Sequence, residues 1–178
     1  MGDRVNVLIL GHSFVRRFRL FLEQDQDNRT SCDMNVEKAN ISYLGIGGRT
    51  VSKLFSSNIP QIKTLKPRVI LLEIGTNDLC VKGRRPEWVG SDIEHLVSFL
   101  HTHCGVLFIM VCLVIHHSTI PVYVYDFNEK VDVLNQFLRV VIEPLEFAEW
   151  PSGTFRSHFT QGWCPFERYG KLCPLSQL

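Results

Sequence analysis

The sequence predicts an α/β protein built around a parallel sheet, and two observations support that prediction. Short apolar runs, each long enough for one buried strand, recur along the chain at a spacing of about thirty residues. Amphipathic stretches with helical spacing of their apolar residues lie between several of these runs. Strands that are apolar on both faces and alternate with helices are typical of a parallel sheet covered by helices on both sides.

Five apolar segments are predicted strands. They span residues 5–10, 41–44, 68–74, 106–115 and, with the weakest pattern, 145–150. Three amphipathic stretches are predicted helices, because their apolar residues recur every three or four positions. They span residues 14–23, 88–101 and 131–142. Pro60, Pro67 and Pro86 are assigned to loops, since proline lacks the backbone N–H that helices and strands use.

The bulk composition fits one folded domain without a strong charge. The chain has 178 residues, and its 19 Lys and Arg nearly balance 18 Asp and Glu, which leaves a net charge of +1. This excludes a global field that would attract nucleic acid or an anionic membrane. The basic clusters Arg16-Arg17-Arg19 and Lys82-Arg84-Arg85 are interpreted as solvated surface. Nucleic-acid association through the second cluster is a weaker alternative.

The sequence predicts an intracellular, cytoplasmic protein without a cofactor or a metal. Residues 5–10 form a strand pattern rather than a secretion signal, and the apolar run at 106–115 has ten residues, about half of a membrane span. The six cysteines contain no C-x-x-C pair, which argues against a zinc site and for reduced thiols. Cys104 and Cys112 are expected in the core. No pattern predicts an oligomeric state.

Three motifs that follow predicted strands carry the candidate chemistry. They are Gly11-His12-Ser13-Phe14, Gly45-Ile46-Gly47-Gly48-Arg49-Thr50 and Gly75-Thr76-Asn77-Asp78. Loops that leave the carboxyl ends of parallel strands meet at one edge of the sheet, where ligands bind. The three motifs are therefore expected to converge at that edge.

Ser13 is the candidate nucleophile. It directly precedes a predicted helix, so its backbone N–H is expected among the unpaired donors at the helix start. A serine in this position is also a common N-cap, and on Ser13 alone that interpretation is favoured. Gly48 offers a backbone N–H and Asn77 an amide N–H, which are the donors that an oxyanion needs. Asp78 is interpreted as the organiser of its own turn.

The three motifs, in this order, resemble the SGNH (GDSL-like) hydrolase family over nearly the whole chain. The resemblance implies a three-layer α/β/α sandwich, the flavodoxin-like SGNH hydrolase fold, with a central parallel sheet of about five strands. It also implies that Ser13 attacks an ester carbonyl, and that the Ser13 N–H, the Gly48 N–H and the Asn77 amide hold the oxyanion. His12 stands where many relatives have Asp. The short form is also similar to esterase-type domains of some retrotransposon-derived reading frames.

The C-terminal part departs from the family pattern. The family has an Asp-x-x-His block ahead of its final helix, but the matching stretch here is Gln161-Gly162-Trp163-Cys164-Pro165-Phe166. Gln161 thus replaces the orienting Asp, and Cys164 replaces the general base. Losing a triad member costs several orders of magnitude in rate. The chain therefore divides into an SGNH hydrolase-like domain, residues 1–150, and an atypical tail, residues 151–178.

No other histidine brings an aspartate at the spacing of that block. His158 has Phe155 three positions before it. His116 and His117 follow the fourth predicted strand, where they could face the same edge, but they are interpreted as loop residues. Three further histidines are assigned to a predicted helix and its end, namely His95, His101 and His103.

A one-base shift of the reading frame would explain the tail. Synonymous codons exist for residues 161–173 that, read one base later, encode Lys-Asp-Gly-Val-His-Leu-Asn-Asp-Met-Gly-Asn-Tyr. Only the Gly of that motif is forced, by Trp163 followed by Cys164, so the sequence shows compatibility with the shift. The hypothesis is that a frame change after Phe147 and before Gln161 produced the present C-terminus. A gene sequence whose codons for residues 148–178 cannot yield Asp-Gly-Val-His would exclude it.

Two functions from different classes remain open. The first is a serine esterase that acts on a small-molecule ester through Ser13 and is impaired because the Asp and His pair is missing. The second is a non-catalytic domain, a vestigial or binding pseudoenzyme, that keeps the pocket. The acyl and alcohol groups of a substrate depend on pocket loops that carry no readable pattern.

Overall fold

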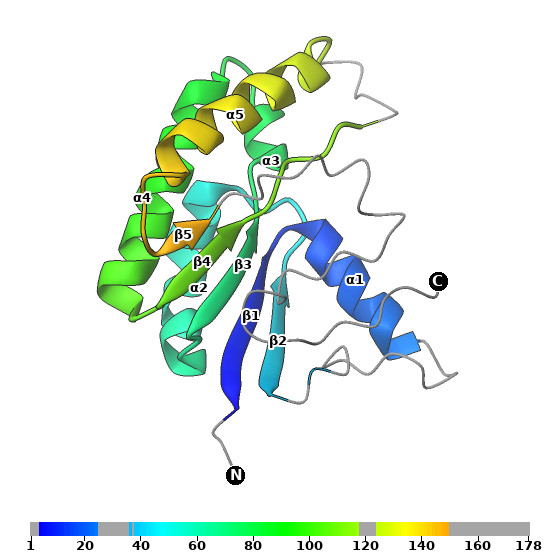
Figure 1. Ribbon diagram of the computed structural model, residues 1–178. Coiled ribbons are helices and arrows are strands. Elements are labelled where there is room, and N and C mark those ends of the chain that lie inside the picture. Colours follow the sequence, from blue (N-terminus) through cyan, green and yellow to red (C-terminus); the bar gives the residue numbers. More distant parts are fainter. Residues whose placement is uncertain (1–3, 25–35, 37, 118–123, 150–178) are drawn as a thin grey trace.

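The computed structural model describes residues 4–24, 36, 38–117 and 124–149, which form a parallel sheet flanked by helices (Figure 1). The five strands of this described part lie in the order β2-β1-β3-β4-β5, and every neighbouring pair is parallel. Their bounds are β1 Val5–Gly11, β2 Ala39–Gly45, β3 Val69–Glu73, β4 Phe108–Val111 and β5 Ala148–Glu149. The predicted α/β class is confirmed, and each strand overlaps its predicted segment.

Three helices match the predicted ones. They are α1 Ser13–Gln24, α4 Pro86–Cys104 and α5 Phe127–Ile142. The helix α2 Val51–Leu65 and the short α3 Thr76–Leu79 have no counterpart among the predicted helices. Thr50 caps α2, because its side-chain oxygen accepts the Lys53 N–H at 3.3 Å.

The assignment of Pro60 and Pro86 to loops is wrong, while Pro67 does lie between two elements. Pro86 is the first residue of α4, where the missing N–H has no partner within a helix in any case. Pro60 lies inside α2 and removes one backbone hydrogen bond. Leu54 and Ile62 are fully buried on either side of it, so tertiary packing of the apolar face outweighs the local cost.

The helices form two layers, one on each face of the sheet. The connections between parallel strands are right-handed. The chain moves one way along the sheet from β1 to β2, and the opposite way from β2 through β3 and β4 to β5. As a result α1 lies on one face, whereas α2, α4 and α5 lie on the other (Figure 1). This arrangement is the predicted three-layer α/β/α sandwich.

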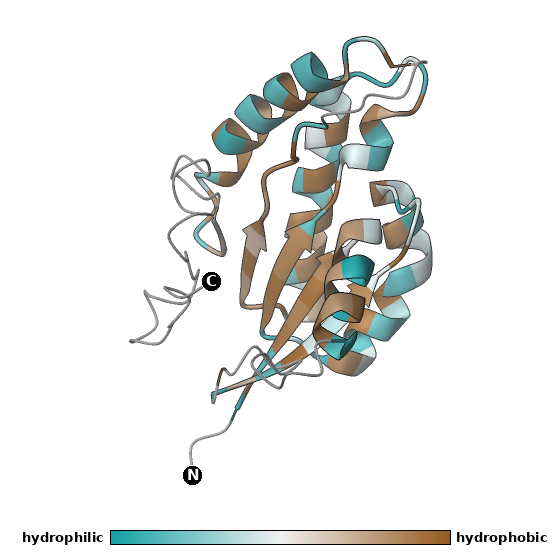
Figure 2. Cartoon of the chain, turned by 90° about the vertical axis from the view of Figure 1, so that its right-hand side faces the viewer, coloured by the Kyte–Doolittle hydropathy of each residue, from teal (hydrophilic) through white to brown (hydrophobic). Residues whose placement is uncertain are grey.

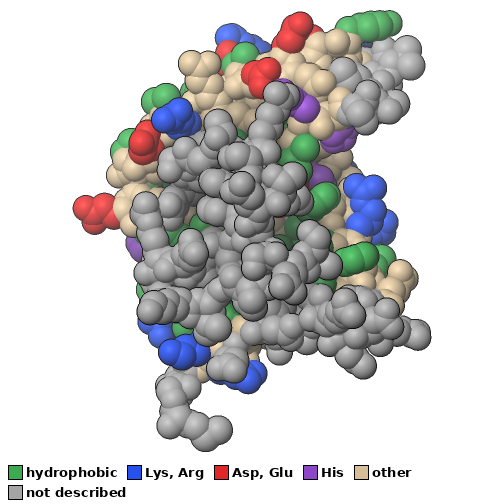
Figure 3. Space-filling view, turned by 45° about the vertical axis from the view of Figure 1, so that its right-hand side comes forward, with side chains coloured by type: hydrophobic (Ala, Val, Ile, Leu, Met, Phe, Trp, Pro, Cys, Tyr) green, Lys and Arg blue, Asp and Glu red, His purple; other side chains and the backbone are tan. Residues whose placement is uncertain are grey.

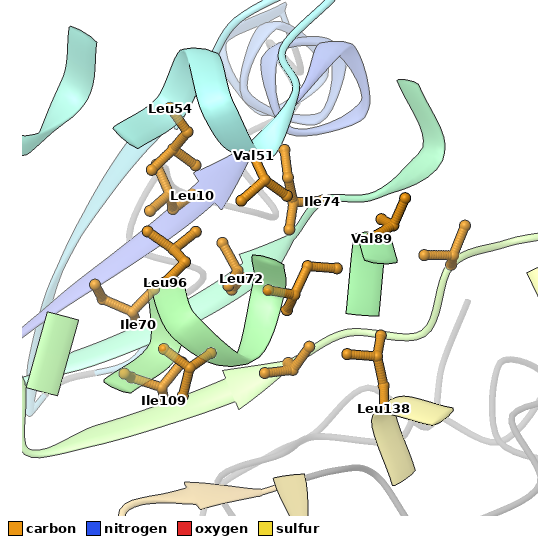
Figure 4. Packing of buried hydrophobic residues seen from close by; sticks show 14 of the residues in the cluster. Leu10, Val51, Leu54, Ile70, Leu72, Ile74, Val89, Leu96, Ile109 and Leu138 are labelled. Atoms are coloured by element: carbon orange, nitrogen blue, oxygen red, sulfur yellow. The ribbon is translucent and has the colours of Figure 1, made fainter. Parts of the chain in front are cut away.

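The main core lies between the sheet and the layer of α2, α4 and α5 (Figure 4). Alternate strand residues, such as Leu10, Leu72 and Ile109, point into it and meet Leu54 of α2 and Leu96 of α4. The strands are hydrophobic along most of their length, while polar and hydrophobic residues alternate along the helices (Figure 2). Because its strands are buried on both faces, they appear in the sequence as continuous apolar runs.

On the other face, α1 packs against β1 and β2. Its buried side chains include Val15, and the ring of Phe18 meets Tyr43 edge-on at 6.1 Å between centroids. Gly45 permits the close approach, because a Cβ there would lie 2.2 Å from the backbone nitrogen of Arg16. This packing holds the start of α1, and with it Ser13, at the end of β1.

The thiols of Cys80, Cys104 and Cys112 are free, and the remaining cysteines lie outside the described residues. Cys104 packs against the main core, and burial raises the pKa of Cys112 to about 12. Within the described ranges, no helix combines the length and the apolar character needed to cross a bilayer.

Candidate active site

The three predicted motifs lie at the same edge of the sheet. β1 runs between β2 and β3, and all three strands point the same way, so the loops that follow them emerge next to one another. The loop after β2 is joined to the end of β1, since the Ile46 N–H donates to the Gly11 carbonyl at 3.1 Å. Ser13 at the start of α1, Gly48 in the loop after β2 and Asn77 in α3 therefore lie on neighbouring segments at the carboxyl edge.

Ser13 is the first residue of α1 rather than its cap. The interpretation of Ser13 as an N-cap is therefore replaced by one in which His12 caps the helix. The Phe14 N–H donates to Nδ1 of His12 at 3.3 Å, so the imidazole accepts a backbone N–H at the helix start, as an Asn or Asp side chain does at an N-cap. The Ser13 hydroxyl is half-buried, and its Oγ lies 3.5 Å from the same Nδ1.

His12 also contacts Glu73 at the end of β3. Nε2 of His12 lies 2.7 Å from Oε1 of Glu73, and both side chains are buried, with 8% and 11% of their surface exposed. The contact is short but is not aligned as a hydrogen bond, since Nε2 of His12 has no hydrogen-bond partner among the described residues. Sequence reasoning missed Glu73, which is 61 positions from His12, although its place at the end of a central strand was a usable signal.

Gly48 and Asn77 are linked through Arg49, the residue that follows Gly48 in the loop after β2. Gly48 adopts φ 66°, a conformation that favours glycine, and is exposed. The Asn77 Nδ2 donates to the Arg49 carbonyl at 2.9 Å. An amide nitrogen carries two N–H groups, so this bond leaves Asn77 one further donor. The bond fixes the loop after β2 to the loop after β3.

Asp78 does more than organise its own turn, which corrects the interpretation made from its sequence. Both of its carboxylate oxygens accept the Val51 N–H, at 3.1 and 3.3 Å, so Asp78 anchors the start of α2. Asp78 is buried, and this burial raises its pKa from 3.8 to about 6, against the opposing effects of the Val51 N–H and the positive charge of Arg84. The residue is structural.

The histidines after β4 have partners that sequence spacing did not reveal. Nε2 of His116 lies 2.8 Å from Oδ1 of Asp132 on α5, and about half of the His116 side chain is exposed. The Asn128 side chain bonds both the N–H and the carbonyl of His117. Both are loop residues, as predicted, and the β4 strand from which they continue is separated from β1 by β3. His158 lies outside the described residues.

The described surface offers no other obvious site. No group of three or more His, Cys, Asp and Glu side chains within the described ranges could hold a metal ion. Histidine, hydrophobic and basic side chains lie near one another on the upper right of the face in Figure 3. In the cluster Lys82-Arg84-Arg85, Arg84 pairs with Asp92 and Arg85 with Glu87, which reduces the positive charge available to a nucleic acid.

The sequence model of the GDSL-like lipase/acylhydrolase family matches residues 10–161, which include all three motifs. The chain belongs to this family. The match ends at residue 161, where the Asp-x-x-His block of the GDSL-like family is expected and where the chain has Gln161 and Cys164 instead. No curated protein sequence matches this family member.

Solved structures with the same fold include esterases. A GDSL-like lipase from Bacteroides thetaiotaomicron aligns with a TM-score of 0.59 and 15% identity, over 80% of this chain and 68% of that one. A catalytic mutant of an acetylxylan esterase from Geobacillus stearothermophilus aligns with a TM-score of 0.56 and 15% identity, over 80% and 74%. Another acetyl xylan esterase aligns at 0.54 and 16%, over 75% and 72%. At these identities the likeness supports the fold of a GDSL-like protein.

Proposed function

We propose that this member of the GDSL-like family is a serine ester hydrolase domain in which Ser13 is the nucleophile. The main support is that Ser13 opens α1 at the carboxyl end of β1, beside the loops that carry Gly48 and Asn77. In this proposal the Ser13 N–H, the Gly48 N–H and the second Asn77 amide N–H bind the oxyanion that forms on attack. The substrate is a small-molecule ester, and the protein acts inside the cell.

The proposed hydrolase is slow. Gln161 and Cys164 occupy the positions at which the family has its orienting Asp and its base. Residues 1–150 supply the hydrolase-like domain, and residues 151–178 replace the block with a tail of different chemistry. A serine hydroxyl without an efficient base remains neutral and attacks an ester slowly.

A non-catalytic domain is the second candidate, and the same two positions favour it. If the loss of Asp and His removed all turnover, the site would bind an ester or an acid without cleaving it. The two candidates differ in whether Ser13 forms a covalent bond with a reactive ester analogue.

Labelling with a fluorophosphonate probe tests the proposal, together with hydrolysis of p-nitrophenyl acetate. Three folded proteins are compared: the natural chain, its Ser13→Ala variant, and a repaired chain whose tail from about residue 151 has the shifted reading with Lys-Asp-Gly-Val-His-Leu-Asn. We expect slow labelling of the natural chain at Ser13, ester hydrolysis little above background, and no labelling of Ser13→Ala. If neither the natural nor the repaired chain is labelled at Ser13, the domain is non-catalytic.

A further inference from the structure

We propose that His12 is the general base for Ser13 and that Glu73 positions the His12 ring, an inference that rests on the ester hydrolysis proposed above. The base would then be His12, the residue next to the nucleophile in the chain, in place of the histidine of the family's C-terminal block. The three side chains form a chain of contacts, from Ser13 Oγ to His12 Nδ1 at 3.5 Å and from His12 Nε2 to Glu73 Oε1 at 2.7 Å.

The contacts of His12 determine which ring nitrogen carries the proton. The Phe14 N–H can only donate, so Nδ1 of His12, which lies 3.3 Å from it, is the unprotonated nitrogen and accepts this bond. The proton of the neutral ring is then on Nε2, beside the Glu73 carboxylate. In the resting state this single electron pair accepts the Phe14 N–H and lies 3.5 Å from Ser13 Oγ, so Nδ1 takes up the serine proton only when the bond to Phe14 is broken.

In this proposal Glu73 stabilises the imidazolium that forms during the reaction. When Nδ1 takes up a proton the imidazole becomes a cation, and a carboxylate 2.7 Å from Nε2 stabilises a cation in a site where both side chains are nearly excluded from water. The end of β3 holds Glu73 in place, since a Cβ on Gly11 of β1 would lie 2.2 Å from the Glu73 carbonyl oxygen. The pair therefore lies at the adjacent ends of two paired strands, β1 and β3.

The present contact between Ser13 and His12 is long for a hydrogen bond, and the reaction would shorten it. Such catalytic contacts commonly tighten when the substrate is bound. Rotation of the Ser13 side chain about its Cα–Cβ bond changes this distance without moving the backbone.

The proton transfers balance without any further group. The Ser13 hydroxyl proton moves to Nδ1 of His12 while Oγ bonds to the ester carbonyl carbon. When the tetrahedral intermediate collapses, the bond from that carbon to the alcohol oxygen breaks, and the alcohol oxygen takes the proton from Nδ1. A water molecule then gives a proton to Nδ1 as its oxygen bonds to the acyl carbon, and Ser13 recovers that proton as the acid leaves.

The competing explanation is that His12 only caps α1, and His12→Asn separates the two roles. Asn is among the best N-cap residues and can accept the Phe14 N–H, but its amide cannot take up a proton. We expect the rate of fluorophosphonate labelling at Ser13 to fall at least about a hundredfold in His12→Asn, the scale of general-base catalysis, with the fold retained in circular dichroism. An unchanged labelling rate in the folded variant would overturn the proposal.

Glu73 is tested with a pair of variants that separate charge from shape. Glu73→Gln keeps the size and an acceptor oxygen but removes the charge, whereas Glu73→Asp keeps the charge on a shorter side chain. If Glu73 stabilises the charged ring, Gln lowers the labelling rate at least about tenfold and Asp preserves more of it. The opposite order, with Gln harmless and Asp damaging, would assign Glu73 a packing role and overturn its part of the proposal.

Two controls distinguish failure of this proposal from failure of the proposed function. Among the described residues, His116 is the other histidine that is paired with a carboxylate, and we expect labelling to be unchanged in His116→Gln; a loss comparable to that of His12→Asn would make the His116 and Asp132 pair the base. In the repaired chain the tail histidine takes over, so His12→Asn should leave its labelling nearly intact. If the repaired chain is labelled and the natural chain is not, ester chemistry at Ser13 stands and the base role of His12 is wrong.

Discussion

At the scale of single residues, the buried carboxyl of Asp78 makes the stability of the fold depend on pH. Its pKa is about 6 in the folded protein and 3.8 for an unperturbed carboxyl, so the folded state holds this proton more tightly than the unfolded state. The stability that Asp78 contributes is therefore fully present below about pH 3.8 and is lost as the pH rises through about 6. The difference corresponds to roughly 3 kcal/mol.

Asp78→Asn should remove this pH dependence while keeping an oxygen that accepts the Val51 N–H. Because the natural chain loses stability as Asp78 ionises, the free energy of unfolding of Asp78→Asn should rise relative to that of the natural chain by roughly 3 kcal/mol, mostly between pH 4 and pH 7. Urea denaturation of both proteins at several pH values measures it. Parallel pH profiles would show that Asp78 keeps an ordinary pKa.

The sequence predicts where a site residue lies when its place follows from the order of the strands. It does not predict which side chain from a distant element contacts that residue. Ser13, Gly48 and Asn77 follow strands, so counting strands was enough to bring them to one edge. Glu73 lies at the end of a strand and could have been found in the same way, whereas Asp132 lies on α5, and no pattern around His116 indicates it. The spacing of the Asp-x-x-His block directs attention to residues 161–164, which lie outside the described residues.

At the scale of elements, the contact between α1 and β2 positions the nucleophile. Gly45→Ala should disturb it, since the new Cβ would lie 2.2 Å from the Arg16 backbone nitrogen, which cannot move without the helix. We expect a loss of about 1–3 kcal/mol in the free energy of unfolding, together with slower labelling of Ser13. Gly47→Ala is the matched control, because the nearest atom to its Cβ is the end of the Arg16 side chain at 3.9 Å. Equal stability of the two variants would contradict the close packing of α1.

The strands were easier to predict than the helices for a physical reason. A strand buried on both faces must be apolar at nearly every position, and this leaves a continuous run in the sequence. The helix α2 contains Pro60 and buries Asn58 along with Leu54, so its pattern is interrupted at positions where packing rather than local preference decides the structure. The short α3 has only four residues, too few for any periodic pattern.

At the scale of the whole molecule, the two faces of the sheet are covered unequally by the described helices. The main core is closed by α2, α4 and α5, whereas α1 is the one described helix on the opposite face. Val7, Ile9 and Met110 are buried strand residues outside the main core and, by the alternation of a strand, belong to that opposite face. We expect a helix of the repaired tail to cover these residues beside α1.

Restoring the shifted reading of the tail should therefore change both rate and stability. The repaired chain regains a histidine that removes the Ser13 proton and an aspartate that holds the tautomer of that histidine, so the rate of ester hydrolysis should rise at least about a thousandfold over that of the natural chain. Ser13→Ala in the repaired chain should abolish the gain. The final helix of the family would also regain an apolar face to pack on the sheet, and the melting temperature should increase. A repaired chain that melts higher yet hydrolyses no faster would mean that the substitution of His12 for the family Asp, or a loss of the pocket, had ended family-type catalysis before the frame changed.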